Sequence, residues 1–343
     1  MAQRAPQDRH VPVMLERCTS VMMQCLGPVA EDGGTPVVID ATLGLGGHSQ
    51  ALLEATAASG SPVVQQAQII GIDRDPQALE AASQRLAPFA SRFTAVRAVY
   101  HEIPQISQQY VGAGSVLAGV LFDLGVSSLQ LDEKERGFAY SYDAPLDMRM
   151  DSAEDSADET AAELLERIDE QELRRVLREY GEERFASRIA RSIMARQQQA
   201  PITTTAELAE LVDAAVPAAA KRTGGHPAKR TFQALRIAVN RELDVLREAV
   251  PAAMDELAIG GRVVAMSYHS LEDRIVKQAF AARTNSSAPA GLPVELEQHK
   301  ATFRPVIRGV EVADEEEVSL NPRASSAKLR SVEKIRPTAR STA

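Results

Sequence analysis

The sequence predicts an α/β fold with a mainly parallel sheet and an inserted all-helical domain. Short β-branched runs alternate with helical patterns in the first third of the chain, which is typical of βαβ units. From about Asp132 the pattern becomes charged and Leu/Ile-periodic. A strand pattern returns at residues 262–268, so the helical stretch is expected to lie inside the α/β domain and not after it.

Local patterns predict the individual elements. Pro76 suits the first turn of a helix because no N–H is needed there, and Thr204 with Glu207 has the spacing of a capping box. In chain order, strands are expected at 37–40, 69–73, 93–99, 116–123, 262–268 and 327–335, and helices at 48–57, 76–86, from 204 to before Pro217, and as one continuous helix at 236–257.

These elements also predict the domain organisation. The expected parts are a first core segment at 1–138, a helical substrate-recognition domain at 139–230, a second core segment at 231–336 and a disordered tail at 337–343.

Composition excludes several classes of protein. The chain has 343 residues, of which 44% are hydrophobic and 25% charged, a balance unlike that of collagen-like, disulfide-framework or disordered chains. No apolar run approaches the roughly 18 to 20 residues that span a bilayer, and residues 1–9 lack the apolar core of a secretory signal. Cys18 and Cys25 lie two helical turns apart, too far for a bridge. We therefore expect a cytoplasmic protein with free thiols and no membrane partner.

Charge is unevenly distributed along the chain. Lys and Arg number 38 against 47 Asp and Glu, which leaves a net charge of −9. Residues 151–172 alone hold ten acidic residues and one arginine, whereas residues 221–247 hold seven cations and two acids. The overall acidity argues against nucleic-acid binding through bulk charge but leaves room for a focused cationic face. The acidic stretch is expected to face away from any nucleic acid.

The glycine-rich turn at residues 44–49 indicates a nucleoside site. Glycines let a ligand approach the backbone, and the following helix start offers free N–H groups. Ser49 stands where the dinucleotide fingerprint needs a third glycine or alanine, which weakens a pyrophosphate interpretation. Asp73 ends the next strand and is placed to accept hydrogen bonds from ribose hydroxyls. The pattern alone leaves the identity of the cofactor open, and such a turn can also serve only tight packing.

Several long motifs carry a resemblance to a known family. They are DLGVSS at 123–128, QLD at 130–132, RGF at 136–138, DAPLDMRMD at 143–151, GEERFA at 181–186, HPAKRTFQALRI at 226–237, SYHSLEDR at 267–274 and NPR at 321–323. In this order they resemble the bacterial cytosine-N4 methyltransferases of small-subunit ribosomal RNA. The likeness extends from His10 to about Ile335. Tyr268 departs from the pattern, because the family usually has phenylalanine there.

The resemblance implies a fold, a cofactor and a substrate. The fold is that of class I S-adenosylmethionine-dependent methyltransferases, Rossmann-like, with an inserted helical domain. S-adenosylmethionine would be the methyl donor, S-adenosylhomocysteine the product, and no metal is expected. The substrate would be a decoding-centre cytidine of 16S rRNA within the small ribosomal subunit, and a homodimer is expected. Carried over by position, the cofactor contacts would be Gly46, Gly47, His48, Asp73, Tyr100, Asp123 and Gln130.

The catalytic group is less defined than the cofactor site. Candidates are Asp123, Ser127, Ser128 and His269. Our hypothesis is that Asp123 fixes the cofactor while the turn of Ser127 and Ser128 shapes the cytosine pocket. Each candidate also has a plainer interpretation: a strand cap for Asp123, turn hydrogen bonds for the serines, and a strand-end position for His269. Likewise, His48 can cap a helix, Tyr100 can pack at the sheet edge and Gln130 can face solvent.

Cationic residues in and after the HPAKRTFQALRI motif, and at the end of SYHSLEDR, predict contact with the RNA backbone. The candidates are Lys229, Arg230, Arg236, Arg241 and Arg274. A solvated helix face is the alternative for each. The target base has to be unpaired or flipped out to reach a buried cofactor. Two other functions stay open: a non-catalytic factor in small-subunit assembly, and an amino-methyltransferase acting on DNA or a small molecule.

Overall fold

The computed structural model describes residues 11–31, 34–153, 156–221, 226–289 and 295–338. Contacts divide the chain into two compact units, residues 1–125 with 243–343, and residues 126–242. The expected tail at 337–343 lies outside the described residues from 339 onward.

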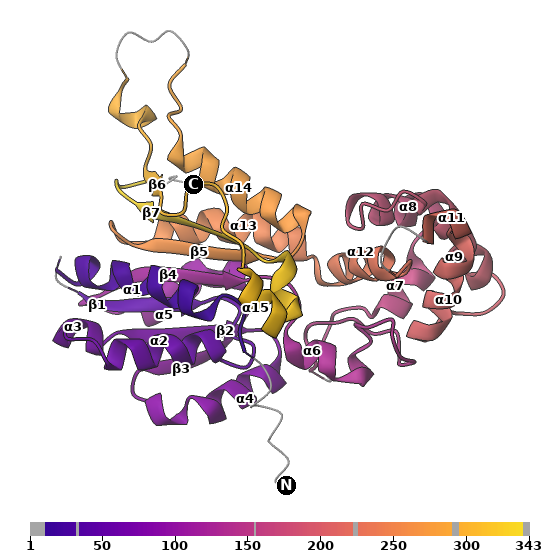
Figure 1. Ribbon diagram of the computed structural model, residues 1–343, viewed down its shortest axis with the longest axis horizontal. Helices are drawn as coiled ribbons and strands as arrows, with labels where there is room; N and C mark the ends of the chain where they lie inside the picture. Colours follow the sequence, from indigo (N-terminus) through magenta and orange to yellow (C-terminus); the bar gives the residue numbers. More distant parts are fainter. Residues whose placement is uncertain (1–10, 32–33, 154–155, 222–225, 290–294, 339–343) are drawn as a thin grey trace. The chain divides into compact units, whose positions relative to one another are not determined.

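The first unit contains a sheet of seven strands in the order β3-β2-β1-β4-β5-β7-β6, counted over the described residues (Figure 1). The strands are β1 Thr35–Asp40, β2 Gln68–Asp73, β3 Phe93–Arg97, β4 Ser115–Asp123, β5 Arg262–Ser267, β6 Phe303–Pro305 and β7 Lys328–Lys334. Strands β1 to β5 pair in parallel, and β7 joins β5 and β6 antiparallel. The expected mainly parallel sheet is confirmed. Because the strand order reverses between β1 and β4, ligands are expected at the carboxyl ends of these strands.

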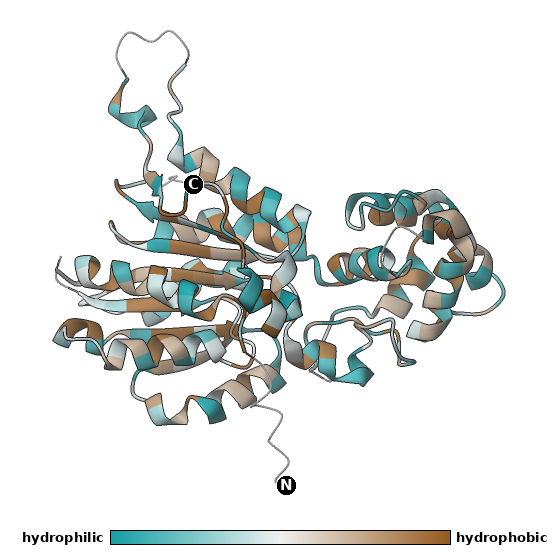
Figure 2. Ribbon diagram, viewed as in Figure 1, coloured by the Kyte–Doolittle hydropathy of each residue, from teal (hydrophilic) through white to brown (hydrophobic). Residues whose placement is uncertain are grey.

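Helices of the first unit cover the sheet. They are α1 Leu15–Glu31, α2 Gly47–Ala57, α3 Pro62–Gln65, α4 Pro76–Arg85, α5 Ile103–Tyr110, α14 Ser270–Thr284 and α15 Glu315–Leu320, with α13 Glu242–Glu256 starting at the boundary between the units. Helix α1 packs on β4 and β5 so closely that a Cβ on Gly119 would lie 2.1 Å from Met22 Sδ. Cys18 and Cys25, on the same helix, are buried free thiols. Figure 2 shows the hydrophobic residues concentrated along the strands.

The second unit is helical in its described part. Its helices are α6 Ser128–Asp132, α7 Ala161–Arg167, α8 Glu170–Glu179, α9 Ala186–Gln197, α10 Thr205–Ala215, α11 Ala218–Lys221 and α12 Lys229–Asn240. They enclose a separate hydrophobic core that includes Leu165, Ile189 and Leu235. The Thr204 capping box and the end of α10 before Pro217 agree with the sequence prediction.

Two sequence predictions differ from this arrangement. The continuous helix expected at 236–257 is wrong, because Arg241 adopts a left-handed conformation (φ 51°) that ends α12 before α13 begins. The helical unit also begins earlier and ends later than the expected 139–230. Helix α12 packs against α7 and α8, so residues up to the break at Arg241 belong with the helical unit.

Candidate active site at the carboxyl edge of the sheet

A sharp turn joins β1 to α2. Gly44 and Gly46 both adopt the left-handed conformation, with φ of 50° and 76°, which costs a side-chain-bearing residue about 1 to 2 kcal/mol. Gly47, the first residue of α2, is tightly packed, since a Cβ there would lie 2.4 Å from Pro12 Cγ. The turn therefore requires glycines, and it leads directly into the start of α2, where the first N–H groups have no partner within the helix.

Asp73 ties this turn to the end of β2. Its Oδ2 accepts a hydrogen bond from the Gly44 N–H at 2.9 Å, and its Oδ1 accepts one from the Asp75 N–H at 3.0 Å. Burial raises the pKa of Asp73 to about 6, although these two hydrogen bonds act in the opposite direction. Each carboxylate oxygen accepts one backbone donor and keeps capacity for another. The side chain is partly exposed, so a ligand with two neighbouring hydroxyls can use both oxygens.

Asp123, at the end of β4, is held from three sides. The Tyr268 hydroxyl donates to Asp123 Oδ1 at 2.7 Å, and the Asp123 N–H donates to Thr42 Oγ1 at 2.7 Å. His48 Nε2 lies 3.5 Å from Asp123 Oδ2, an ion-pair distance. Burial raises the pKa of the Tyr268 hydroxyl, and the neighbouring Asp123 raises it further, so Tyr268 stays a donor. Asp123 is therefore more than a strand cap.

His48 is buried between two carboxylates. Its side chain does not cap α2, because the cap position is Gly46. Burial alone would lower the pKa of His48, but Asp123 and Asp40 outweigh it and raise the pKa above the usual value. Neither ring nitrogen has a hydrogen-bond partner within the described chain, which is unusual for a buried polar group. Asp40 accepts the Ser49 hydroxyl at 2.7 Å, and its pKa is raised by burial.

Two further candidates lie on the first unit. Tyr100 begins a short 3-10 helix, Tyr100–Glu102, and its ring meets Phe122 edge-on with centroids 5.8 Å apart. Phe122 directly precedes Asp123, so Tyr100 packs beside the end of β4. His269 precedes α14, and its Nε2 lies 3.1 Å from Glu272 Oε1. Glu272 Oε2 also accepts the Tyr268 N–H at 2.8 Å, so His269 borders the segment that holds Asp123.

Ser127 and Gln130 form a capping box at the start of α6 in the helical unit. The Gln130 N–H donates to Ser127 Oγ at 3.3 Å, and Gln130 Oε1 accepts the Ser127 N–H at 2.9 Å. Gln130 Nε2 also donates to the Met150 carbonyl at 3.4 Å. Gln130 is buried, which contradicts the solvent-exposed alternative. The side chain of Ser128 lies outside the described part of the structure.

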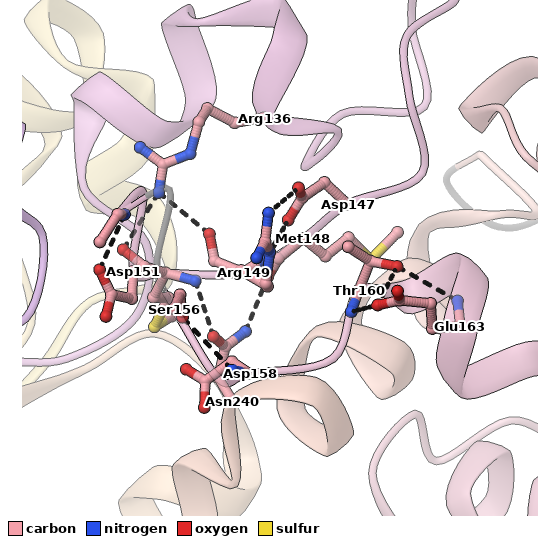
Figure 3. Close-up of polar contacts among 12 residues, drawn as sticks. Arg136, Asp147, Met148, Arg149, Asp151, Ser156, Asp158, Thr160, Glu163 and Asn240 are labelled. Atoms are coloured by element: carbon pink, nitrogen blue, oxygen red, sulfur yellow. Dashed lines mark hydrogen bonds and ion pairs between the residues drawn. The ribbon is translucent and has the colours of Figure 1, made fainter. Parts of the chain in front are cut away.

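Figure 3 shows how the DAPLDMRMD segment is held within the helical unit. Arg136 Nη2 donates to the carbonyls of Arg149 and Met150, both at 3.0 Å. Asn240, which is 3% exposed, accepts the Met150 N–H at 2.7 Å and donates to the Met148 carbonyl at 2.8 Å. These anchors fix a turn in which Met148 has a φ of 64°. Arg136 belongs to the RGF motif, but the sequence predicted no role for it, and Asn240 was not predicted at all.

Arg149 lies in this segment and forms a bidentate ion pair with Asp147. Its Nε and Nη2 donate to the two oxygens of Asp147 at 2.9 and 2.8 Å. Both side chains remain about one quarter exposed.

The five cationic candidates have different surroundings. Four are exposed: Lys229, Arg230, Arg241 and, in the first unit, Arg274. Arg236 is not, because its guanidinium donates to both carboxylate oxygens of Glu242 at 2.9 and 3.0 Å in a largely buried pair. This pair bridges the break between α12 and α13, so Arg236 has a structural role there.

The first-unit site is rich in carboxylates. Asp40, Asp73 and Asp123 are the last residues of three strands at one edge of the sheet. Burial raises the pKa of Asp40 and of Asp73, and neighbouring carboxylates raise both further. Such a site disfavours an anionic pyrophosphate and favours a cationic ligand. Across the described residues, no group of three His, Cys, Asp or Glu side chains is arranged to hold a metal ion. Within the same ranges, every helix is too short or too polar to traverse a bilayer.

Comparison with known proteins decides the family. The model of the MraW methylase family matches residues 7–335. The chain belongs to the MraW methylase family. Two relatives carry the name ribosomal RNA small subunit methyltransferase H. The one from Pseudarthrobacter chlorophenolicus is 54% identical over 329 residues and 96% of each chain, and the one from Micrococcus luteus is 53% identical over 341 residues and 99% of each chain.

The resemblance found in the motifs is thereby confirmed. This MraW-family methylase is an S-adenosylmethionine-dependent methyltransferase with the class I fold. Its first unit fits that cofactor, since it offers a glycine turn at a helix start, a carboxylate with spare acceptor capacity and a buried imidazole beside Asp123 whose ring nitrogens make no hydrogen bond within the described chain.

Proposed function

We propose that this methylase transfers a methyl group to the exocyclic N4 amine of a cytidine in the decoding centre of 16S rRNA, within the small ribosomal subunit in the cytoplasm. The observation that supports this most is the meeting of Asp73, Asp123 and the glycine turn at the switch point of the sheet, in a chain whose relatives bear an rRNA methyltransferase name. We also expect a homodimer, which sedimentation analysis of the purified chain would test.

Residues of the first unit would hold the cofactor. Gly46 and Gly47 lie where α2 begins and its first N–H groups have no partner within the helix, and both oxygens of Asp73 can accept the two ribose hydroxyls. Tyr100 offers an aromatic edge beside β4 for packing against the adenine. His48 and Asp123 would contact the amino-acid portion of the cofactor, whose ammonium group would pair with the Asp123 carboxylate. For Gln130, a cofactor contact stays a prediction from the family resemblance.

The difficulty of the reaction lies in the acceptor. The N4 amine of cytosine is a weak nucleophile because its lone pair is delocalised into the ring. When bound, S-adenosylmethionine supplies an electrophilic methyl group on a sulfonium. The chain's own contribution is alignment, which can supply much of the lowering of the barrier, together with acceptors that localise the lone pair on the amine. Asp123 is suited to fix geometry, because Tyr268 and Thr42 restrain it on two sides.

We assign the cytosine pocket to the turn of Ser127 and Ser128. The Ser127 hydroxyl accepts the Gln130 N–H and retains its own proton to donate. His269 is a second candidate for contact with the base, since it neighbours the Tyr268 segment.

Labelled methyl transfer tests the proposal. The full chain is incubated with S-adenosylmethionine carrying a labelled methyl group and, separately, with small subunits, naked 16S rRNA and DNA. We expect label in small subunits, recovered as N4-methylated cytidine by mass spectrometry of nucleosides. Label in DNA alone would favour the other amino-methyltransferase, and binding to subunits without label would favour an assembly factor.

One variant tests the division of roles. We expect Asp123→Ala to weaken cofactor binding measured by calorimetry. If Asp123→Ala lowers turnover while cofactor affinity is unchanged, Asp123 acts on the amine and our assignment is wrong.

A further inference from the structure

Three aromatic rings form a column from the core of the helical unit to its surface. Phe232, on α12, is 3% exposed and belongs to the hydrophobic core. Tyr140 meets it edge-on, with centroids 5.7 Å apart and an interplanar angle of 81°. His226 stacks on Tyr140 with centroids 4.4 Å apart and an angle of 16°, and it is exposed. The outermost ring of the column is therefore an imidazole that faces solvent.

The His226 ring is held in one orientation. Its Nδ1 accepts a hydrogen bond from the Ala228 N–H at 3.2 Å, which leaves the proton of the neutral ring on Nε2. Tyr140 fixes the plane of the ring, and Phe232 in turn fixes Tyr140. An exposed side chain normally keeps its rotamer freedom and loses it on binding. Here that ordering has already occurred, so a planar ligand stacked on His226 would bind to a preorganised surface.

Cations accompany the exposed ring. Lys229 and Arg230 follow His226 within one turn of chain and are both exposed. Arg230 Nη1 donates to the Glu182 carbonyl at 2.7 Å, which fixes the direction of this side chain. The Lys229 N–H donates to the His226 carbonyl at 3.0 Å. A planar ring close in the chain to exposed cations matches the chemistry of single-stranded nucleic acid, in which bases stack and phosphates pair with Lys and Arg.

We propose that His226, supported by Tyr140, is a stacking platform for one unpaired base of the RNA substrate, with Lys229 and Arg230 contacting the adjacent phosphates. The inference rests on the proposed rRNA function and adds a binding surface separate from the cofactor site. The base on this platform is recognised by its face, so many bases fit. The phosphates beside it make the contact sensitive to salt.

Two substitutions of His226 separate stacking from the local hydrogen bond. His226→Phe keeps a planar ring against Tyr140 but loses the acceptor for the Ala228 N–H. His226→Asn keeps a side-chain acceptor near that N–H but cannot stack. Equilibrium binding of the full-length chain to purified small subunits is measured at several salt concentrations. Stacking of one base on an aromatic ring corresponds to about a 5- to 150-fold change in affinity.

We expect His226→Asn to lose affinity by about that factor, and His226→Phe to stay within about twofold of wild type. Both keep the wild-type salt slope, whereas Lys229→Ala lowers the slope by about one. His299→Asn is the matched control, because His299 is a partly exposed histidine of the first unit whose Nδ1 lies 2.9 Å from Ser287 Oγ. It is expected to bind subunits like wild type.

Wild-type affinity in His226→Asn would overturn the platform, and so would a His226→Phe variant as weak as His226→Asn. Cofactor affinity and thermal melting of the same preparations establish that each variant is folded. Methyl transfer by the wild-type chain is followed on the same subunits. Failure of wild-type transfer with intact binding removes the proposed function, whereas intact transfer with wild-type binding of His226→Asn removes only the platform.

Discussion

Removing one hydroxyl tests how Asp123 is positioned. In Tyr268→Phe the ring remains, and the hydrogen bond lost is the one donated to Asp123 Oδ1 at 2.7 Å. A hydrogen bond to a charged group contributes about 1.5 to 3 kcal/mol. The Asp123 side chain is 25% exposed, so water can replace part of this contact. We therefore expect the variant to lose about 1 to 2 kcal/mol of this stabilisation, which corresponds to a fall of about 5- to 30-fold in kcat/KM for S-adenosylmethionine.

The assay separates cofactor binding from turnover. Calorimetry gives the Kd of S-adenosylmethionine, and labelled transfer to small subunits gives kcat and KM. Because Asp123 is proposed to hold the cofactor, we expect Kd to rise by most of this factor and kcat at saturating cofactor to change less. Tyr142→Phe is the control, since it loses a hydroxyl bond to the Leu131 carbonyl in the helical unit. A Tyr268→Phe enzyme within twofold of wild type in both quantities would contradict the positioning of Asp123 by Tyr268.

Three further predictions concern the turn, its carboxylate and the helical unit. Cofactor affinity should fall as pH drops below about 6, because burial raises the pKa of Asp73 to about 6 and the protonated carboxyl loses an acceptor. Calorimetry across about pH 5 to 8 checks this. Asp73→Asn should bind the cofactor weakly, and its affinity should depend less on pH. Gly46→Ala should cost about 1 to 2 kcal/mol, measured by thermal unfolding, because φ is 76° and the new Cβ would lie 3.1 Å from Leu86 Cδ1. Asn240→Ala should lower the free energy of unfolding, measured by urea denaturation, by about 2 to 4 kcal/mol, because three hydrogen bonds of a buried side chain are lost. A loss below about 1 kcal/mol would contradict the anchoring role of Asn240.

Local patterns predicted the strands and helices of the sheet but not the break at Arg241. The alternation of β-branched runs and helical periods depends on neighbours in the sequence, so it can be read from one segment at a time. The end of α12 lies instead at the left-handed Arg241, next to Asn240, which binds the backbone of Met150 ninety residues earlier in the chain. An apolar period continues through this point in the sequence, so the pattern alone shows neither feature.

The site shows the same division between local and distant information. Asp73 and Asp123 were predicted because each directly ends a strand, and parallel strands end at one edge. The capping role of Gln130 was also visible in principle, because Ser127 and Gln130 have capping-box spacing. The bond from Tyr268 to Asp123 was not, since it requires knowing that β5 lies beside β4.

The carboxylates around the glycine turn also affect how strongly the methyl donor binds relative to the product. Asp40 and Asp73 have raised pKa values, chiefly through burial and in part through the negative charge of their neighbours. A cation placed among them relieves this repulsion, and it does so more strongly where water is excluded. The methyl donor carries a positive sulfonium, whereas the thioether left after transfer is neutral. The same carboxylates that attract the donor thus interact less with the product, so the charge of this edge favours exchange of spent cofactor for fresh donor.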